Sequence, residues 1–289
     1  MTAANLIPDA ELIGVLDVPI AGRRRSRRPT LVISSTILGI WVLCALFGGV
    51  IEPYSPSAQL PRLKFAHPGA DHLFGTDGFG RDVLSRVIAG AQPVLTIAPL
   101  AVLLATVLGT IFGLLTGYFG GVTDSIATKV LQSIAILPPL FPAVLAVALL
   151  GRSTTVLVLV LAFSFTPIIT WTVRAATLVE REKQFVEAAR LRGESVFYIL
   201  GREILPNITS SIIVESTVRL ADAVFSIATL AFVGLGAAPG SPNWGAQVAD
   251  NRVNLQFAWW TVVFPAVAVA SLVISVSLLA DVIRERRRS

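Results

Sequence analysis

The chain has 289 residues, a net charge of +5 at pH 7, and a composition that is 54% hydrophobic and only 14% charged. Soluble domains average about 25% charged residues, so this composition excludes an ordinary soluble domain and indicates a chain that lives in a bilayer. The arginines lie between apolar runs and form no aromatic-laced surface, which argues against a nucleic-acid binder and favours contact with membrane lipid.

Six apolar runs are long enough to cross a membrane, since a hydrocarbon core about 30 Å thick needs roughly 20 apolar residues in a helix. The first run follows the cluster RRRSRR and is longer than the apolar core of a signal peptide, so we expect it to be retained as a span. The pattern predicts an all-α integral membrane protein with six transmembrane helices, at about 30–51, 93–117, 127–150, 154–174, 208–236 and 258–280.

The distribution of Lys and Arg orients these spans, because cytoplasmic segments of membrane proteins carry an excess of both. With the N-terminus inside, the inner segments hold 16 of the 23 Lys and Arg residues and the outer segments hold six. Both termini are therefore predicted to be cytoplasmic. The chain then divides into an N-terminal tail (1–29), a first helix (30–51), an extracytoplasmic loop (52–90), a core (91–280) and a C-terminal tail (281–289).

Three prolines, Pro138, Pro139 and Pro142, interrupt the third predicted span in the stretch ILPPLFP. A proline removes an intrahelical hydrogen bond and kinks the helix. Broken helices often border the pathway of transporters, although kinks are common in membrane proteins of every kind. We expect these prolines to line a translocation path.

A polar, charged segment, FVEAARLRGESVFYILGREILP at 185–206, separates the fourth and fifth spans and lies on the predicted cytoplasmic side. Its first helix is expected to end at Gly193, since glycine commonly follows a helix C-terminus. A second short helix is expected from about Ser195 to Leu205, where Pro206 stops it. This segment is either a solvated connector or a docking surface.

Small and charged residues favour the docking alternative. Ala188 and Ala189 would form a flat patch that lets another protein's backbone come close, and Glu187 can pair with a basic partner. An isolated charged loop is more often a simple connector, so composition alone does not decide between the two.

The fifth predicted span carries three charged residues, Glu215, Arg219 and Asp222. They are four and three residues apart, so they share one helix face. A charge at the bilayer centre costs roughly 2.5–3.5 kcal/mol on insertion scales, and mutual pairing offsets part of that cost. The face is either a polar lining of a translocation path or a structural ion pair near the inner end of the span.

The spacing of the polar segment resembles the EAA loop of ATP-binding cassette (ABC) importer permeases, with Glu-Ala-Ala at 187–189, then Gly193, then Ile-Leu-Pro at 204–206. HLFGTDGFGRDVLSRVIAGA (72–91), GYFGG (117–121) and LAFVGLGAAPGSPNWGAQVAD (230–250) are similar to the peptide and nickel group of these permeases. The chain resembles most the C-type permease of dipeptide and oligopeptide importers. The resemblance covers roughly residues 30–288.

This resemblance implies a type I ABC importer permease fold in which the hairpin 180–206 docks into a cytoplasmic ATPase subunit. The partners implied are a second homologous permease, two ABC ATPase subunits and an extracytoplasmic peptide-binding protein. The chain has no G-x-x-x-x-G-K-[ST] stretch, so we expect ATP and Mg²⁺ to be bound by the ATPase subunits and no cofactor or catalytic residue in this chain. The coupling residues implied are Glu187, Ala188, Ala189, Gly193, Ile204, Leu205 and Pro206.

The outer segments 52–92 and 237–257 are expected to face the binding protein. The charged residues of the first segment are more apt to fix the loop by hydrogen bonds, and Trp244 fits an interfacial anchor as well as a contact. The two histidines, His67 and His72, lie in a loop that lacks the firm three- or four-ligand geometry of a zinc site, so no metal site is predicted. The candidate contact residues are Asp77, Arg81, Asp82, Trp244 and Gly245.

The sequence therefore predicts a permease subunit of an ATP-driven importer in a bacterial plasma membrane, which moves di- or oligopeptides by alternating access. Three alternatives stay open. The cargo could be nickel or another small solute, the chain could be an intramembrane enzyme built on the charged face of the fifth span, or it could only anchor an ATPase.

Overall fold

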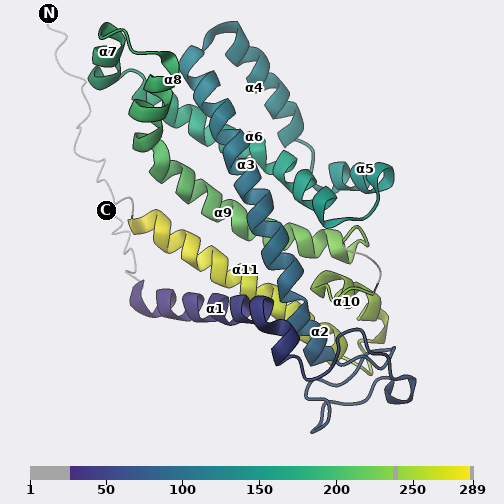
Figure 1. Cartoon of the computed structure of the whole chain (residues 1–289). Helices are drawn as coiled ribbons and strands as arrows, with labels where there is room; N and C mark the ends of the chain where they lie inside the picture. Colours follow the sequence, from purple (N-terminus) through teal and green to yellow (C-terminus); the bar gives the residue numbers. More distant parts are fainter. Residues whose placement is uncertain (1–26, 237–239, 287–289) are drawn as a thin grey trace, which may run out of the picture.

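The computed structural model describes residues 27–236 and 240–286, so most of the predicted N-terminal tail and the end of the C-terminal tail lie outside it (Figure 1). The described residues form helices joined by turns and loops, with one isolated β-bridge between Thr76 and Asp82. The longer helices are α1 (Arg27–Ile51), α2 (Val83–Ala89), α3 (Ala91–Phe119), α4 (Gly121–Ala135), α5 (Leu140–Leu150), α6 (Thr154–Glu180), α7 (Gln184–Leu191), α9 (Leu205–Phe232), α10 (Trp244–Asn251) and α11 (Trp260–Arg286). The shorter ones are η1 (Pro61–Leu63), α8 (Val196–Tyr198), the π-helical turn η2 (Ile199–Ile204) and η3 (Arg252–Asn254).

Four continuous stretches of helix are long and apolar enough to cross a membrane: Pro29–Ile51, Val83–Phe119, Thr154–Glu180 and Trp260–Glu285. They correspond to the first, second, fourth and sixth predicted spans. The second stretch includes α2, which lies inside the predicted extracytoplasmic loop, so helix begins earlier there than expected. The first stretch agrees with the predicted span to within one residue at its start.

The third predicted span is not one straight helix. α4 and α5 meet at an angle of 84° across a break of four residues, and together they could form a fifth span. The break falls at 136–139, where Pro138 and Pro139 lie, so the helix is interrupted at the prolines that were expected to kink it, and the span over 127–150 stays a prediction. Proline at these positions removes the hydrogen bonds that would have carried the helix through.

The fifth predicted span is α9, which is 28 residues long. It is more charged than the four continuous stretches, because every 18-residue stretch of α9 contains Glu215, Arg219 and Asp222. The count of six spans therefore depends on α9 and stays a prediction, as do the cytoplasmic termini. α9 packs against α3, α6 and α11, which places its middle inside the helix bundle.

The most extensive helix–helix packing is between α3 and α6. Gly109, Gly113 and Gly117 repeat every four residues on α3, and they meet Ile169, Val173 and Thr177 on α6. A Cβ at any of the three glycines would lie 2.6–2.8 Å from one of these side chains, so the two backbones approach as closely as glycine allows. In a bilayer, where lipid is as apolar as the helices, such close packing is what holds helices together.

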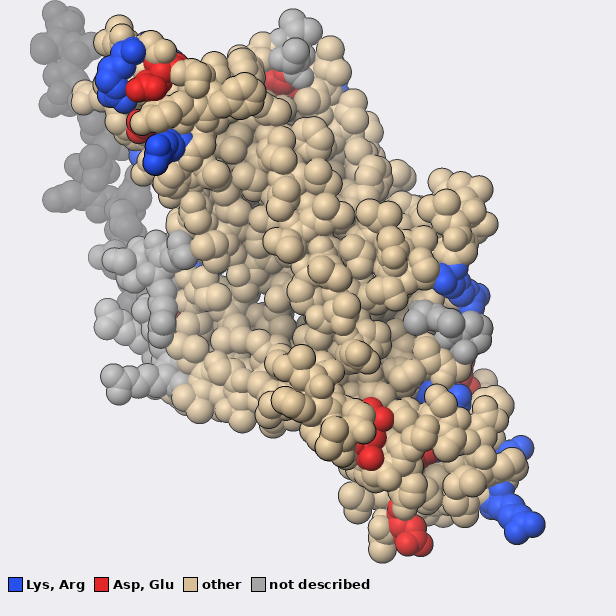
Figure 2. All heavy atoms as spheres, viewed as in Figure 1, with Lys and Arg blue, Asp and Glu red and all other residues tan. Residues whose placement is uncertain are grey.

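On the face that Figure 2 shows, charged side chains gather mainly at two opposite ends of the molecule, and little charge lies between them. One end carries α7 and α8, and the other carries the loop 52–82 with α2 and α10 (Figures 1 and 2). An apolar belt between two charged ends is the distribution that a bilayer imposes. The two ends are the hairpin predicted to be cytoplasmic and the loops predicted to lie outside.

Candidate functional site: a hairpin at one end and a folded module at the other

The hairpin begins with α7, and Gly193 ends this helix. Gly193 adopts φ +77°, a conformation that glycine reaches without strain, and its N–H donates to the Arg190 carbonyl at 3.0 Å. The Glu194 N–H donates to the Ala189 carbonyl at 3.2 Å, which completes a glycine-terminated helix end. Gly193 therefore ends the first helix of the hairpin, as predicted.

One face of α7 is buried against the second arm of the hairpin. Val186 and Ala189 have no exposed surface, and they pack in the same cluster as Ile199, Leu200 and Ile204. Glu187 and Ala188 lie on the opposite, exposed face. The predicted flat patch of two alanines is thus wrong: Ala188 is available to a partner, and Ala189 is part of the hairpin's own core.

Two large apolar side chains project from the hairpin. Leu191 is 83% exposed and Phe197 is 84% exposed, one on each arm. Neither was predicted, although both stand out as apolar residues in a charged segment at a distance from the apolar spans. On an end of the molecule that faces water, such side chains mark a protein contact when they lie together on one rigid element.

The second arm is not the separate short helix that was predicted. α8 begins at Ser195, whose hydroxyl accepts from the Tyr198 N–H, and continues through η2 into α9. Pro206 is the second residue of α9, so it lies inside the continuous helical stretch and does not stop the second arm. Ile204, the last residue of η2, is fully buried. Because α9 begins at the next residue, the second arm of the hairpin is a direct extension of α9.

Ionic contacts tie the two arms together and join them to α3. The Arg192 guanidinium lies 3.7 Å from Glu194 and 3.5 Å from Glu203 on the second arm. Arg181, just before α7, donates from Nη1 to the carbonyls of Gly117 and Tyr118 at 2.9 and 3.3 Å. The hairpin thus moves with the end of α3 as well as with α9.

The charged residues of α9 do pair on one face, as predicted. The Arg219 Nε lies 2.9 Å from Glu215 Oε1, and its Nη1 lies 2.7 Å from Asp222 Oδ2. Glu215 and Arg219 are largely covered, at 13% and 18% exposed, whereas Asp222 is 47% exposed. The group lies about 21 Å along the helix from its first residue, near the middle and not near the inner end.

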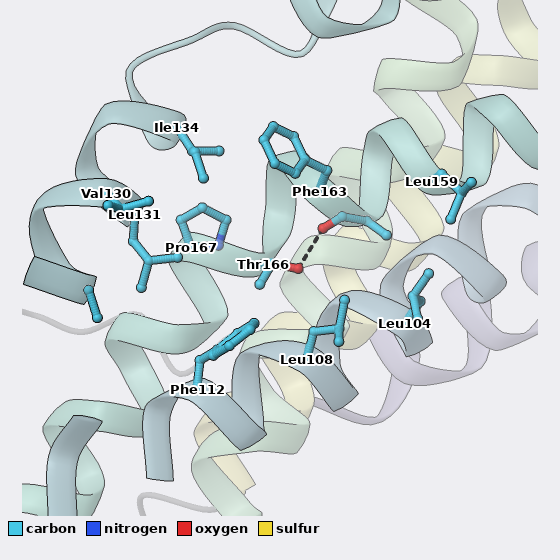
Figure 3. Close-up of a pocket in the computed structure, with 12 residues that line it drawn as sticks. Leu104, Leu108, Phe112, Val130, Leu131, Ile134, Leu159, Phe163, Thr166 and Pro167 are labelled. Carbon is cyan, nitrogen blue, oxygen red and sulfur yellow. Dashed lines mark hydrogen bonds between the residues drawn. The ribbon is translucent and has the colours of Figure 1, made fainter. Parts of the chain in front are cut away.

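The three prolines of the third predicted span lie at the bend between α4 and α5. Behind α4 is an apolar cavity of about 660 Å³, formed between α3, α4 and α6 (Figure 3). Its one polar side chain, Thr166, donates its hydroxyl proton to the Ala162 carbonyl at 2.7 Å and has none left for a ligand. The cavity suits apolar chains and not a peptide backbone; its lining includes Leu104, Leu108, Phe112, Val130, Ile134, Phe163 and Pro167.

At the other end, the polar residues of the outer loop form a folded module. Asp77 accepts from the backbone N–H groups of Phe79 and Arg81 and from Arg81 Nε at 2.7–3.0 Å. Asp82 caps α2 by accepting from the Ser85 N–H at 2.8 Å, and its other oxygen lies 2.9 Å from His72 Nδ1. These contacts are the loop-fixing hydrogen bonds that were expected.

The candidate binding-protein contacts at this end are inside the module and not on its surface. Asp77, Arg81 and Asp82 are 3–5% exposed, and Trp244 is 1% exposed. Trp244 donates from Nε1 to the Val87 carbonyl at 2.8 Å, and Gly245 lies so close to α9 that a Cβ there would be 2.1 Å from the Ala228 carbonyl oxygen. These five residues shape the outer surface from beneath, so direct contact with a partner does not fit their burial.

Arg86 is the central residue of the module, and the sequence did not single it out. It is 2% exposed and donates to the carbonyls of Pro56, Gly240 and Ser241 at 3.1–3.3 Å. It therefore joins the first outer loop to the second, some 155 residues later in the chain. Its place in the stretch GRDVLSR was the one available signal.

Comparison with known proteins identifies this architecture. The family described as "Binding-protein-dependent transport system inner membrane component" matches residues 109–289. The chain belongs to this family. It is a multi-pass membrane protein and the permease subunit of an ABC importer, as the resemblance implied.

Individual relatives agree with this assignment. A protein named as a peptide transport system permease in Brucella suis biovar 1 is 35% identical over 94% of this chain and 92% of its own length. A glutathione transport system permease protein of Escherichia coli O1:K1 is 35% identical over 91% of this chain and 87% of its own. The solved inward-facing MetNI methionine ABC transporter shares the fold, with a TM-score of 0.57 and 17% identity over 69% of this chain and 95% of that chain.

Membership of this family settles the class of the protein. Its relatives are transport permeases of the peptide and nickel group, so the chain is a transport subunit and not an intramembrane enzyme. A permease of a binding-protein-dependent importer works with an ATPase and a binding protein. Among the residues that the structure describes, no three of His, Cys, Asp and Glu lie close enough together to hold a metal ion.

Proposed function

We propose that this chain is the C-type permease of an importer for di- or oligopeptides in a bacterial plasma membrane, with both termini in the cytoplasm. A second homologous permease, two ATPase subunits that bind ATP and Mg²⁺, and an extracytoplasmic peptide-binding protein complete the complex. The names of two relatives, for peptides and for glutathione, support a cargo with peptide bonds. Glutathione is therefore a second candidate cargo, and nickel is a third.

The observation that carries the coupling role is the exposure of one large apolar side chain on each arm of the hairpin. Leu191 and Phe197 project into water from arms that are clamped by Val186, Ile199 and Ile204. An exposed apolar pair stabilises a complex when a partner's groove buries it, at roughly 1.5–3 kcal/mol per side chain. The second arm continues into α9, so motion of an ATPase bound at the tip is carried directly into the membrane bundle.

The test of this role is co-purification of the ATPase subunit. Phe197→Asp and Leu191→Asp, made together, are expected to abolish ATPase binding and peptide uptake while the chain stays in the membrane. Val253→Asp is the matched control for ATPase binding, because Val253 is 76% exposed at the opposite end of the molecule. If the double variant keeps its ATPase at wild-type levels, the hairpin is not the docking surface. Uptake that persists with the ATPase displaced contradicts ATP-driven transport.

We also propose that the charged face of α9 lines the translocation path, since Asp222 is 47% exposed within the middle of a membrane helix. Arg219→Gln leaves two carboxylates unpaired there, and we expect a large fall in the amount of inserted protein. Neutralising all three residues, with Glu215→Gln, Arg219→Gln and Asp222→Asn, is expected to restore the amount but not peptide uptake. If uptake recovers together with the amount, the three residues are only a structural ion pair.

The cargo is identified by the binding protein that co-purifies with the complex. Denaturing that protein and analysing the released ligand by mass spectrometry is expected to give peptides. Release of glutathione, or of nickel, would replace peptides as the cargo without changing the coupling role of the hairpin.

A further inference from the structure

A polar cavity of about 320 Å³ lies where the α5–α6 corner, the outer end of α9 and α10 meet. Its volume is at the lower end of the range of about 300–1,000 Å³ that small-molecule sites occupy. Three charged side chains, Arg152, Asp250 and Arg252, line it together with Gly234, Gly236 and Gly240. The other cavities of comparable size between these helices are lined almost wholly by apolar residues.

The charged groups of this cavity have bonding capacity to spare. Arg152 and Asp250 are exposed and make no hydrogen bond or ion pair with any residue that the structure describes. Arg252 donates from Nη1 to the Ala249 carbonyl at 2.9 Å, and its guanidinium lies 5.8 Å from the Phe232 ring centroid. A guanidinium has five N–H donors, so most of those on both arginines are free for a ligand.

Three glycines line one side of the cavity. Gly234 and Gly240 adopt φ +86° and +84°, conformations that residues with a side chain rarely reach. Gly236 is also part of the lining. The wall has no side chain at these three positions, and the charged side chains are the polar side chains of the described lining.

The cavity lies at the outer end of the face of α9 that carries the charged group. Val233 lines the cavity and follows Asp222 by eleven residues, which is three helical turns, so the two residues lie on the same side of the helix. Their separation along the axis is about 16 Å. The cavity therefore lies three turns further along the helix face that carries the half-exposed carboxylate of Asp222.

We propose that this cavity is an entry subsite for a small zwitterion with a free carboxylate and a free ammonium group, such as the ends of a short peptide. The guanidinium groups of Arg152 and Arg252 bind the carboxylate, a pairing in which two parallel N–H···O bonds can form. The carboxylate of Asp250 binds the ammonium group. The inference rests on the proposed peptide cargo, and it places recognition of the peptide's charged ends in the permease as well as in the binding protein.

The test is equilibrium binding of radiolabelled dialanine to the purified complex in lipid nanodiscs without its binding protein. Saturable binding is expected in wild type, and Arg152→Gln and Arg252→Gln are each expected to weaken it about tenfold, which corresponds to about 1.4 kcal/mol. Asp250→Asn should weaken dialanine but not N-acetyl-dialanine, and the two arginine variants should weaken dialanine but not its C-terminal amide. Arg62→Gln, at an exposed position of the outer loop, is the matched control.

Three outcomes overturn the inference: no saturable binding in wild type, equal losses for the free and blocked peptides, or variants that lose affinity for the binding protein while dialanine binding is unchanged. The last result would make the cavity a docking surface for the binding protein. Peptide uptake into proteoliposomes, measured alongside with the binding protein present, separates the two proposals. Wild type that transports peptide but fails the binding test refutes the subsite alone, and wild type that transports no peptide refutes the proposed cargo.

Discussion

Arg86 holds together two loops that lie far apart in the chain, and it does so from a position that is 2% exposed. Its guanidinium donates to the carbonyls of Pro56, Gly240 and Ser241, and its backbone carbonyl accepts from Gln247 Nε2 at 3.2 Å. Backbone carbonyls that are covered by the fold must find a donor or pay for their lost hydration. A single side chain therefore decides whether the outer surface keeps its shape.

Replacement of Arg86 tests this role. Arg86→Gln is expected to lower the free energy of unfolding of the outer module by about 1–3 kcal/mol, because it leaves the carbonyls of Pro56, Gly240 and Ser241 without their donor. Thermal unfolding of the detergent-purified chain and chymotrypsin cleavage within residues 52–82 would measure the loss. Arg62→Gln, which changes an exposed arginine of the same loop, should behave as wild type. Equal stability of the two variants would show that the two outer loops keep their structure without the Arg86 side chain.

At this scale, the sequence predicts which residues are polar and near one another in the chain, and little about distant partners. Asp77 and Asp82 bond within their own loop, so their loop-fixing role was predictable. The partners of Arg86 lie up to 155 residues away in the sequence, and no local sequence pattern predicts them. Ala188 and Ala189 are equally small, and only the packing of the second arm decides that Ala189 faces inward.

Helices were predictable to the extent that apolar length determines them. α1 and α3 begin and end within a few residues of the predicted spans because a run of apolar residues between charged or glycine-rich borders has one favourable place in a bilayer. The 84° bend between α4 and α5 was not predictable, since prolines say where a helix breaks but not in which direction it continues. The continuity of α8 with α9 was also missed, because proline in a first helical turn and proline after a last turn look alike in a sequence.

The glycine repeat of α3 makes a prediction about packing between elements. Gly113→Val is expected to destabilise the pair of α3 and α6 by about 1–3 kcal/mol, because its Cβ alone would lie 2.6 Å from Val173 Cβ and one side must move away. Gly39→Val is the matched control, since a Cβ at Gly39, on α1, meets nothing within 4 Å. The melting temperature of the two variants in the same detergent would measure the difference. A control that melts as low as Gly113→Val would point to a general intolerance of valine instead.

Across the whole molecule, the hairpin is connected to three helices of the bundle, since it follows α6 directly in the chain and has further connections to α9 and α3. Its second arm continues into α9, and Arg181 at its base donates to the carbonyls of Gly117 and Tyr118 at the end of α3. On α7, Arg190 lies over the Tyr118 ring with its guanidinium carbon 5.1 Å from the centroid. Since α3 is packed tightly on α6, a push on the hairpin is shared among three long helices and is not absorbed by one.

Loss of the contact between Arg181 and α3 should leave ATPase binding intact but impair transport. With Arg181→Gln, we expect the ATPase subunit to co-purify as in wild type, because the exposed tip is untouched, while peptide-stimulated ATP hydrolysis and uptake fall several-fold. Lys183→Gln removes a neighbouring surface ion pair with Glu180, of a kind worth at most about 1 kcal/mol, and should leave both activities intact. Measuring ATP hydrolysis with and without the loaded binding protein distinguishes the two. An Arg181 variant with normal stimulated hydrolysis would show that the bonds from Arg181 to α3 are not needed to transmit the motion.

The charged middle of α9 also bears on how the protein is made. A segment with three ionisable residues at its centre partitions poorly into lipid when it leaves the ribosome by itself. By that time α3 and α6 have already been synthesised, and they offer α9 a protein surface in place of lipid. Membrane integration of α9 is therefore conditional on the earlier helices, so that a fault in their packing would appear in the cell as a chain that is degraded during biogenesis and not as a slow transporter.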